Sequence, residues 1–290
     1  MSVLDGSWQH SDLVTNGVKL HYVTQGEGSL MLMLHGFPEF WYSWRHQIPE
    51  FAKDYKVVAL DLRGYNDSDK PPDLAAYGIS ELINDVRGVI QGLGYESCVL
   101  VAHDWGGAIA WSFANTYPEM VDRLIVTNMP HPAKLAEGLR HPQQLLRSSY
   151  IFFFQVPLIP EIIWQFSNYQ AIETVFVGQA INKSAFTEAD IAAYKNAVAK
   201  PGALTAMLNY YRNVFQGLMN QKWGLIEIPT LMIWGEKDIV FTKELTFGME
   251  AYVKDFRIRY IPDCSHWVQE EQPQLVNQYM QEFLQLSFVE

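Results

Sequence analysis

The chain has 290 residues and a formal net charge of −11 at neutral pH, and 49% of its residues are hydrophobic and 18% charged. This composition is that of a folded globular protein with one large α/β domain or a core with an inserted module, and it argues against disorder. The negative charge, without a cluster of lysine and arginine, argues against a nucleic-acid partner.

Three features bear on the compartment. Cys98 and Cys264 are the two cysteines, so no disulfide framework is expected. The first ten residues have neither the basic nor the apolar region of a secretory signal. The longest apolar stretch, residues 151–164, is interrupted by prolines and polar residues and is shorter than the about 20 residues that cross a bilayer. We therefore expect a cytoplasmic protein with no membrane span.

The predicted strands follow one another in the order of a doubly wound sheet. Asn16 and Gly17 separate two extended segments and predict a hairpin, because both residues tolerate positive φ. Apolar runs separated by helix-length segments then predict a parallel sheet buried on both faces. These runs cover residues 30–34, 57–60, 99–102, 124–127, 230–234 and 256–261, and a final helix is predicted at about 272–286.

The strand signals stop between about residues 132 and 219, where helical patterns rich in aromatic residues replace them, as in 169–176. This change predicts a helical cap of residues 133–218, inserted into a core formed by residues 1–132 and 219–290. A hydrophobic edge of such a cap would suit a substrate portal or the face of a homo-oligomer equally well.

Asp104 stands where an apolar run meets two glycines. Ala102 and Gly106 flank it at two positions on either side, and a strand that turns sharply into a helix needs small residues there. This is the pattern of the nucleophile elbow of α/β hydrolases, with aspartate as the nucleophile. A simple helix N-cap would not account for both small residues. We therefore expect the α/β-hydrolase fold, with a doubly wound, mostly parallel eight-stranded sheet and an inserted helical cap.

Two later loops complete the expected catalytic set. Asp238 follows the run at 230–234 and His266 follows the run at 256–261, which gives the order nucleophile, acid, histidine of this fold. Glu236 competes with Asp238 for the role of the acid. In some relatives of the fold the acid follows the preceding strand, but this chain has Asn128 there.

The first parallel strand is followed by His35-Gly36-Phe37-Pro38, at the place where this fold forms half of its oxyanion hole. We assign the backbone amides of Phe37 and Trp105 to that hole. A plain Gly-Pro turn is the alternative for this segment taken alone.

An aspartate nucleophile decides which bond can be broken. A carboxylate is already an anion at neutral pH and can attack a saturated carbon to form an ester. His266, oriented by Asp238, then activates water to hydrolyse that ester. Ester or amide substrates would give an anhydride, so esterase and protease activities are disfavoured. The expected leaving group is an epoxide oxygen or a halide.

Four segments resemble the epoxide hydrolases of the α/β-hydrolase superfamily, and the likeness extends over nearly the whole chain. The segments are 35–38, 61–68, 103–107 and 265–267. The resemblance implies a cofactor-independent enzyme without a metal, which uses a small apolar epoxide and water and forms a vicinal diol. In the cap, residues 209–213 match the segment that supplies a tyrosine donor, and this implies that Tyr211 protonates the opening epoxide.

The chain departs from this family at two positions. Phe153 stands where many members have a second tyrosine; Tyr150 is a weak candidate for a donor from a shifted position, and Phe153 itself for substrate binding. Asn66 stands where the family often has glycine, and we expect the turn to persist because asparagine tolerates the left-handed conformation.

Two alternatives remain. A haloalkane dehalogenase uses the same nucleophile, but such enzymes commonly have asparagine at the position of Phe37, and Tyr211 would have no task in them. A non-catalytic binding protein on this fold would not need the complete set of Asp104, Asp238 and His266.

Overall fold

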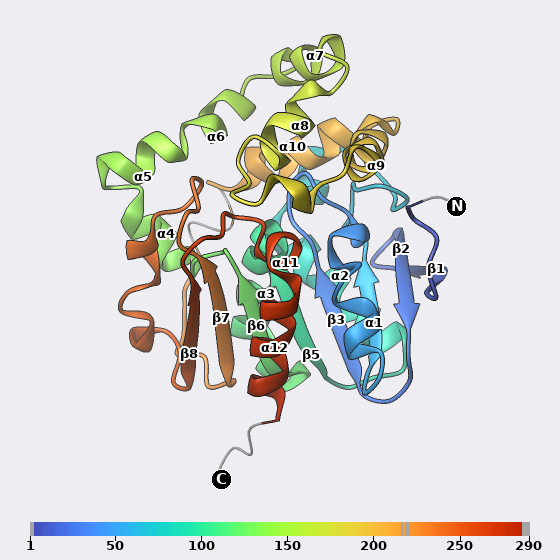
Figure 1. Ribbon diagram of the computed structural model, residues 1–290, viewed down its shortest axis with the longest axis vertical. Helices are drawn as coiled ribbons and strands as arrows, with labels where there is room; N and C mark the ends of the chain where they lie inside the picture. The colour runs from blue at the N-terminus through green and yellow to red at the C-terminus, as the bar shows by residue number, and fades with distance from the viewer. Residues whose placement is uncertain (1–2, 216, 218–220, 286–290) are drawn as a thin grey trace.

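An eight-stranded, mostly parallel sheet forms the centre of the computed structural model, which describes residues 3–215, 217 and 221–285 (Figure 1). The strand order is β1-β2-β4-β3-β5-β6-β7-β8, and only the pairs β1·β2 and β2·β4 among these strands are antiparallel. The strands are β1 (Gln9–Thr15), β2 (Val18–Gln25), β3 (Leu30–Leu34), β4 (Lys56–Leu60), β5 (Cys98–His103), β6 (Val121–Thr127), β7 (Thr230–Gly235) and β8 (Phe256–Ile261). The expected fold is confirmed.

The predicted strands agree closely with the observed ones. β3 and β8 have the predicted bounds, whereas β6 begins three residues earlier than predicted. Its first residues include the charged Asp122 and Arg123, so the apolar pattern did not reveal the start of the strand. The hairpin is confirmed: Asn16 and Gly17 have φ of 47° and 74°, the left-handed pair that a two-residue turn between twisted strands requires. Asn66 also has a positive φ, 38°, as expected.

Helices cover both faces of the sheet because its strands are apolar on both sides. Figure 1 shows α12 (Pro273–Leu284) in front of the sheet and α3 (Asp104–Thr116) behind it, where α3 packs against α2 (Ile79–Gly92). Two short helices, α1 (Ile48–Phe51) and α11 (Val268–Glu271), accompany them.

The described residues between β6 and β7 form helices and contain no strand. These helices are α4 (Pro132–Gly138), α5 (Pro142–Arg147), α6 (Ser149–Phe154), α7 (Ile159–Phe166), α8 (Gln170–Phe176), α9 (Glu188–Ala199) and α10 (Ala203–Asn213). Figure 1 shows most of them across one edge of the sheet. The division into a core and a cap of residues 133–218 stays a prediction, and its second boundary, like the end of the predicted helix 272–286, falls outside the described residues.

In the part of the chain that the structure describes, every helix is too short or too polar to pass through a bilayer. The cytoplasmic location stays a prediction.

Candidate active site

Asp104 occupies the sharp turn between β5 and α3. Its φ is 47°, a left-handed conformation that a non-glycine residue adopts only where the surroundings hold it. Neighbouring backbone approaches so closely that a Cβ atom at Gly106 would lie 2.3 Å from the carbonyl oxygen of Leu34. At Gly36 a Cβ would lie 2.4 Å from the Cβ of Asp104. The glycines are therefore needed to place the Asp104 carboxylate at the edge of the sheet.

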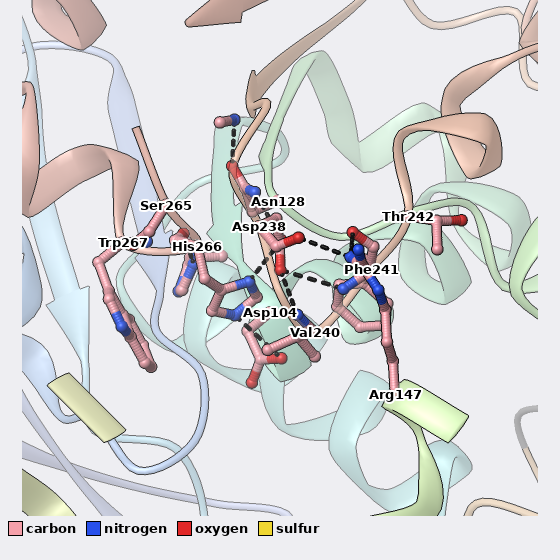
Figure 2. A network of polar contacts seen from close by, with 12 residues as sticks. Asp104, Asn128, Arg147, Asp238, Val240, Phe241, Thr242, Ser265, His266 and Trp267 are labelled. Carbon is pink, nitrogen blue, oxygen red and sulfur yellow. Dashed lines mark hydrogen bonds and ion pairs between the residues drawn. The ribbon is translucent and has the colours of Figure 1, made fainter. Parts of the chain in front are cut away.

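The structure brings together the three residues that the sequence predicted for catalysis. His266 Nδ1 lies 2.8 Å from Asp238 Oδ2, and His266 Nε2 lies 3.6 Å from Asp104 Oδ2. Figure 2 shows the imidazole between the two carboxylates, and all three side chains are buried. Because Nδ1 donates to Asp238, Nε2 is the ring nitrogen that faces Asp104.

Asp238 is held by hydrogen bonds from both sides. Its Oδ1 accepts from the amides of Val240 and Phe241 at 2.6 and 3.0 Å, and its Oδ2 accepts from Asn128 Nδ2 at 2.7 Å (Figure 2). Asn128 Oδ1 in turn accepts from the amide of Gly235 at 2.9 Å. From sequence, Asn128 was notable only because it is not an acid, and its contact with Asp238 was not predicted.

The competing acid, Glu236, does not reach the site. It forms an ion pair with Lys243, and both side chains are partly exposed. The loop that carries Asp238 is also tied to α5, since Arg147 Nη1 donates to the carbonyl oxygens of Asp238 and Phe241 at 2.6 and 3.0 Å. Only the folded arrangement reveals this contact of Arg147.

A buried hydrogen-bonded pair, Glu39 and His103, adjoins the site and was also not predicted from the sequence. Glu39 Oε2 accepts from His103 Nδ1 at 2.8 Å and from the amide of Gly36 at 2.6 Å. His103 Nε2 donates to the carbonyl oxygen of His266 at 3.0 Å. Burial opposes the charge of Glu39, but His103 outweighs this effect and lowers the pKa of Glu39. The pair thus links the loop of residues 35–38 to the backbone of His266.

The electrostatics of the site favour a charged Asp104. Burial alone would raise the pKa of Asp104, but the hydrogen bond and charge of His266 lower it below its ordinary value. For His266 the opposite holds: burial disfavours the imidazolium, and the two carboxylates of Asp238 and Asp104 outweigh burial and raise its pKa. The free site therefore holds an anionic Asp104 beside a protonated His266.

The two expected oxyanion-hole residues adjoin Asp104. The amide of Phe37 donates to Asp104 Oδ1 at 2.8 Å, so this oxygen already accepts a hydrogen bond from one of the two expected backbone donors. Trp105 follows Asp104 in the first turn of α3, where backbone N–H groups have no acceptor within the helix. Asp104 Oδ2 is left facing His266.

A cavity of about 240 Å³ opens above the Asp104 carboxylate. His266, Tyr150 and Tyr211 share its wall with Asp104, and apolar walls come from Phe37, Phe154, Trp164, Val175 and Trp267. The ring of Tyr211 contacts those of Phe37 and Trp105 edge to face, with centroids 5.2 and 5.1 Å apart. Such a site, apolar with a few directed polar groups, suits a small apolar ligand.

The structure does not bring Phe153 into this cavity. Its side chain is 38% exposed and does not line the cavity, whereas Tyr150 does. The reason is the phase of α6: residues four apart share a helix face, so Tyr150 and Phe154 point inward together while Phe152 and Phe153 point outward. Of these two weak candidates, only Tyr150 therefore lines the cavity beside Tyr211.

One group of side chains among the described residues has the spacing of metal ligands. The possible ligand atoms of His21, Asp61 and Asp67 all lie within 4.8 Å of one another. Asp61, however, already accepts hydrogen bonds from His21 at 2.7 Å, from Asn66 at 2.8 Å and from the amide of Trp41 at 2.9 Å. We interpret the group as a hydrogen-bond network, and it does not include a residue of the cavity.

Comparisons with known proteins agree with this geometry. A family model described as the α/β hydrolase fold matches residues 29–273. Epoxide hydrolase 4 of Mus musculus is 46% identical over 277 residues, which cover 93% of this chain and 77% of that protein. An AB hydrolase superfamily protein of Bacillus subtilis is 41% identical and is covered to 96%. The crystal structure of an epoxide hydrolase from Bacillus megaterium in complex with an inhibitor matches with a TM-score of 0.90 at 41% identity, and covers 95% of this chain and 100% of that one.

Proposed function

The chain belongs to the epoxide hydrolases of the α/β-hydrolase fold family, and from this premise we propose that it converts an apolar epoxide to a vicinal diol through an ester on Asp104. One observation carries the proposal: Asp104, His266 and two tyrosines, Tyr150 and Tyr211, line the same apolar cavity. The carboxylate supplies a nucleophile, and the hydroxyl groups supply donors for the oxygen that leaves carbon.

In the first step, Asp104 Oδ2 attacks an epoxide carbon, and the bond from that carbon to the epoxide oxygen breaks. The hydroxyl groups of Tyr211 and Tyr150 donate to this oxygen, and one of them transfers its proton. Burial, followed by the charge of Asp104 and, for Tyr211, the proximity of Tyr150, raises the pKa of both hydroxyl groups. Both tyrosines therefore keep their protons at neutral pH and are ready to donate them.

In the second step, water is deprotonated by His266 Nε2 and attacks the Cγ of the Asp104 ester. The oxygen in contact with the Phe37 amide receives the negative charge, with the amide of Trp105 as second donor. The tetrahedral intermediate then expels the diol oxygen, which takes up a proton, and the Asp104 carboxylate returns. His266 carries the proton between the two events, and Asp238 stabilises its charge.

Esterification itself prepares His266 for the second step. Two carboxylates raise the pKa of His266 in the free site, and the ester removes the charge of one of them. The pKa of His266 then falls, since burial continues to oppose its charge. The imidazolium of the free site therefore gives up its proton only after the first step, and that proton restores the hydroxyl of the tyrosine that protonated the epoxide oxygen. The neutral imidazole can then accept a proton from water.

A trapping experiment tests the two-step proposal. His266→Gln should accumulate the ester, which intact mass spectrometry reads as an increment equal to the whole epoxide and peptide mapping locates at Asp104. Asp104→Ala, the matched control, should show no increment. If His266→Gln turns over slowly without any increment, water attacks the epoxide directly and the proposal is wrong.

A parallel assay separates the epoxide from the halide alternative. Styrene-like and aliphatic epoxides are compared with bromoalkanes, and diol or released bromide is measured. We expect diol to form much faster than bromide is released, because two tyrosines line the cavity and can donate to an epoxide oxygen. Bromide release without diol formation would make the enzyme a dehalogenase.

A further inference from the structure

The outer face of helix α7 is apolar and exposed. Ile159, Ile162, Ile163 and Phe166 recur at the spacing i, i+3, i+4, i+7, which places them on one side of the helix. These four side chains are between 45 and 89% exposed. A helix of a globular protein normally turns such a stripe toward the core, and an exposed apolar patch of this kind marks an interaction surface.

The opposite side of α7 faces the active site. Trp164 is buried and lines the cavity above Asp104. Helix α6 likewise has one side toward the cavity and one toward solvent, since Phe154 lines the cavity and Phe152 is exposed. The same two helices therefore carry both the exposed apolar side chains and part of the cavity wall.

The backbone at both ends of α7 is strained. Leu158 has a φ of 66°, and Asn168 and Tyr169 have φ of 49° and 56°. A bulky residue such as leucine rarely adopts this conformation. The side chain of Leu158 is nevertheless 68% exposed, so burial of that side chain does not compensate for the strained turn. The turn presents an apolar side chain beside the exposed stripe.

Charge restricts what can cover this face. Glu161 is the one charged residue between positions 148 and 168, and it is buried in an ion pair with Arg212 at 2.9 Å. The face itself therefore presents no charge, while the whole chain carries a net charge of −11. This charge repels a second copy of the chain and an anionic lipid surface, but not an uncharged one.

We propose that the α7 face, formed by Leu158, Ile159, Ile162, Ile163 and Phe166, docks on a lipid surface without net charge. Figure 1 shows α7 at one end of the long axis of the molecule, where a flat surface can reach it. Docking brings the cavity next to the lipid, so epoxides dissolved in the lipid reach Asp104 without crossing bulk water. This delivery rests on the proposed function; the docking does not.

Flotation with vesicles of phosphatidylcholine tests the docking. The double variant Ile163→Ser/Phe166→Ser removes two exposed side chains of the face, and Val14→Ser/Phe247→Ser removes two exposed apolar side chains elsewhere as a matched control. The unmodified protein and the control should float with the vesicles. The α7 variant should bind about tenfold less tightly or worse, because apolar area no longer leaves water. Thermal unfolding confirms that both variants are folded.

Three results would overturn the docking. The unmodified protein stays off the vesicles, or the α7 variant floats as well as the control, or phosphatidylserine vesicles bind more strongly than neutral ones. A dimer in analytical ultracentrifugation that dissociates in the α7 variant, together with no flotation, would assign the face to a second copy instead.

Kinetics test the delivery separately. For a long-chain epoxide held in the vesicles, the α7 variant should lose about as much kcat/KM as it loses in vesicle binding. For a water-soluble epoxide, its kcat/KM should equal that of the control. Equal kcat/KM of the two variants on the vesicle-held epoxide would refute delivery. If the unmodified protein floats but hydrolyses neither epoxide, the proposed function fails and the docking stands.

Discussion

Removal of the two cavity hydroxyl groups should slow the opening of the epoxide far more than it weakens binding. In Tyr211→Phe and Tyr150→Phe the ring stays, so the apolar wall of the cavity is kept and only the donor is lost. A hydrogen bond to a developing charge contributes about 1.5 to 3 kcal/mol, and about 1.4 kcal/mol corresponds to tenfold in rate. Each single variant should therefore form the ester about 10 to 150 times more slowly.

The effects of the two substitutions on the activation free energy of ester formation should not be additive. The rings of Tyr150 and Tyr211 contact each other with centroids 5.8 Å apart and line the same cavity, so we expect both side chains to serve the same epoxide oxygen. When one donor is removed, the other can still protonate the opening oxygen. The double variant has neither and should lose more than the product of the single effects.

Single-turnover kinetics measure this prediction. Trp164 and Trp267 line the cavity, so tryptophan fluorescence should change when the ester forms, and quenched-flow mass spectrometry gives the ester directly. Phe153→Leu is the control for a change in α6 that leaves the cavity lining intact. Ester formation in the double variant within threefold of the unmodified rate would refute the assignment of both donors.

Three further predictions concern the residues that hold the nucleophile and the base. Asp104→Asn should lower the pKa of His266, because one of the two carboxylates that raise it is lost; an NMR titration of the imidazole checks this, and an unchanged pKa would contradict it. Asn128→Leu should lower kcat about tenfold or more with little change in KM, because Asp238 loses one orienting hydrogen bond; equal kcat would leave Asn128 a structural residue. Gly106→Ala should destabilise the fold by about 1 to 3 kcal/mol, since its Cβ would collide with carbonyl oxygens at the end of β3; thermal unfolding measures this, and an unchanged midpoint would refute it.

The fold could be predicted from sequence because its strands are long apolar runs with clear ends. β3 and β8 match their predicted bounds, and the hairpin follows from two residues that tolerate positive φ. The grouping of Asp104, Asp238 and His266 could also be predicted, because parallel strands end at one edge of the sheet.

Other contacts of the site could not be read from the sequence. Helix α6 has only six residues, four of them aromatic, so its pattern does not reveal which ones point inward, and both Tyr150 and Phe153 remained candidates. Asn128 and Arg147 act through hydrogen bonds to residues about a hundred positions away. No local pattern contains such a contact.

The position of the helical segment between β6 and β7 has a consequence for how this enzyme can diversify. Asp104, Asp238 and His266 belong to the sheet edge, whereas Tyr150, Tyr211 and much of the apolar wall belong to the segment. Mutations that accumulate in the segment can thus change substrate shape and the proposed acid for the leaving group together, while Asp104, Asp238 and His266 themselves are inherited unchanged. A library confined to residues 132–213 would sample new leaving groups as well as new substrates.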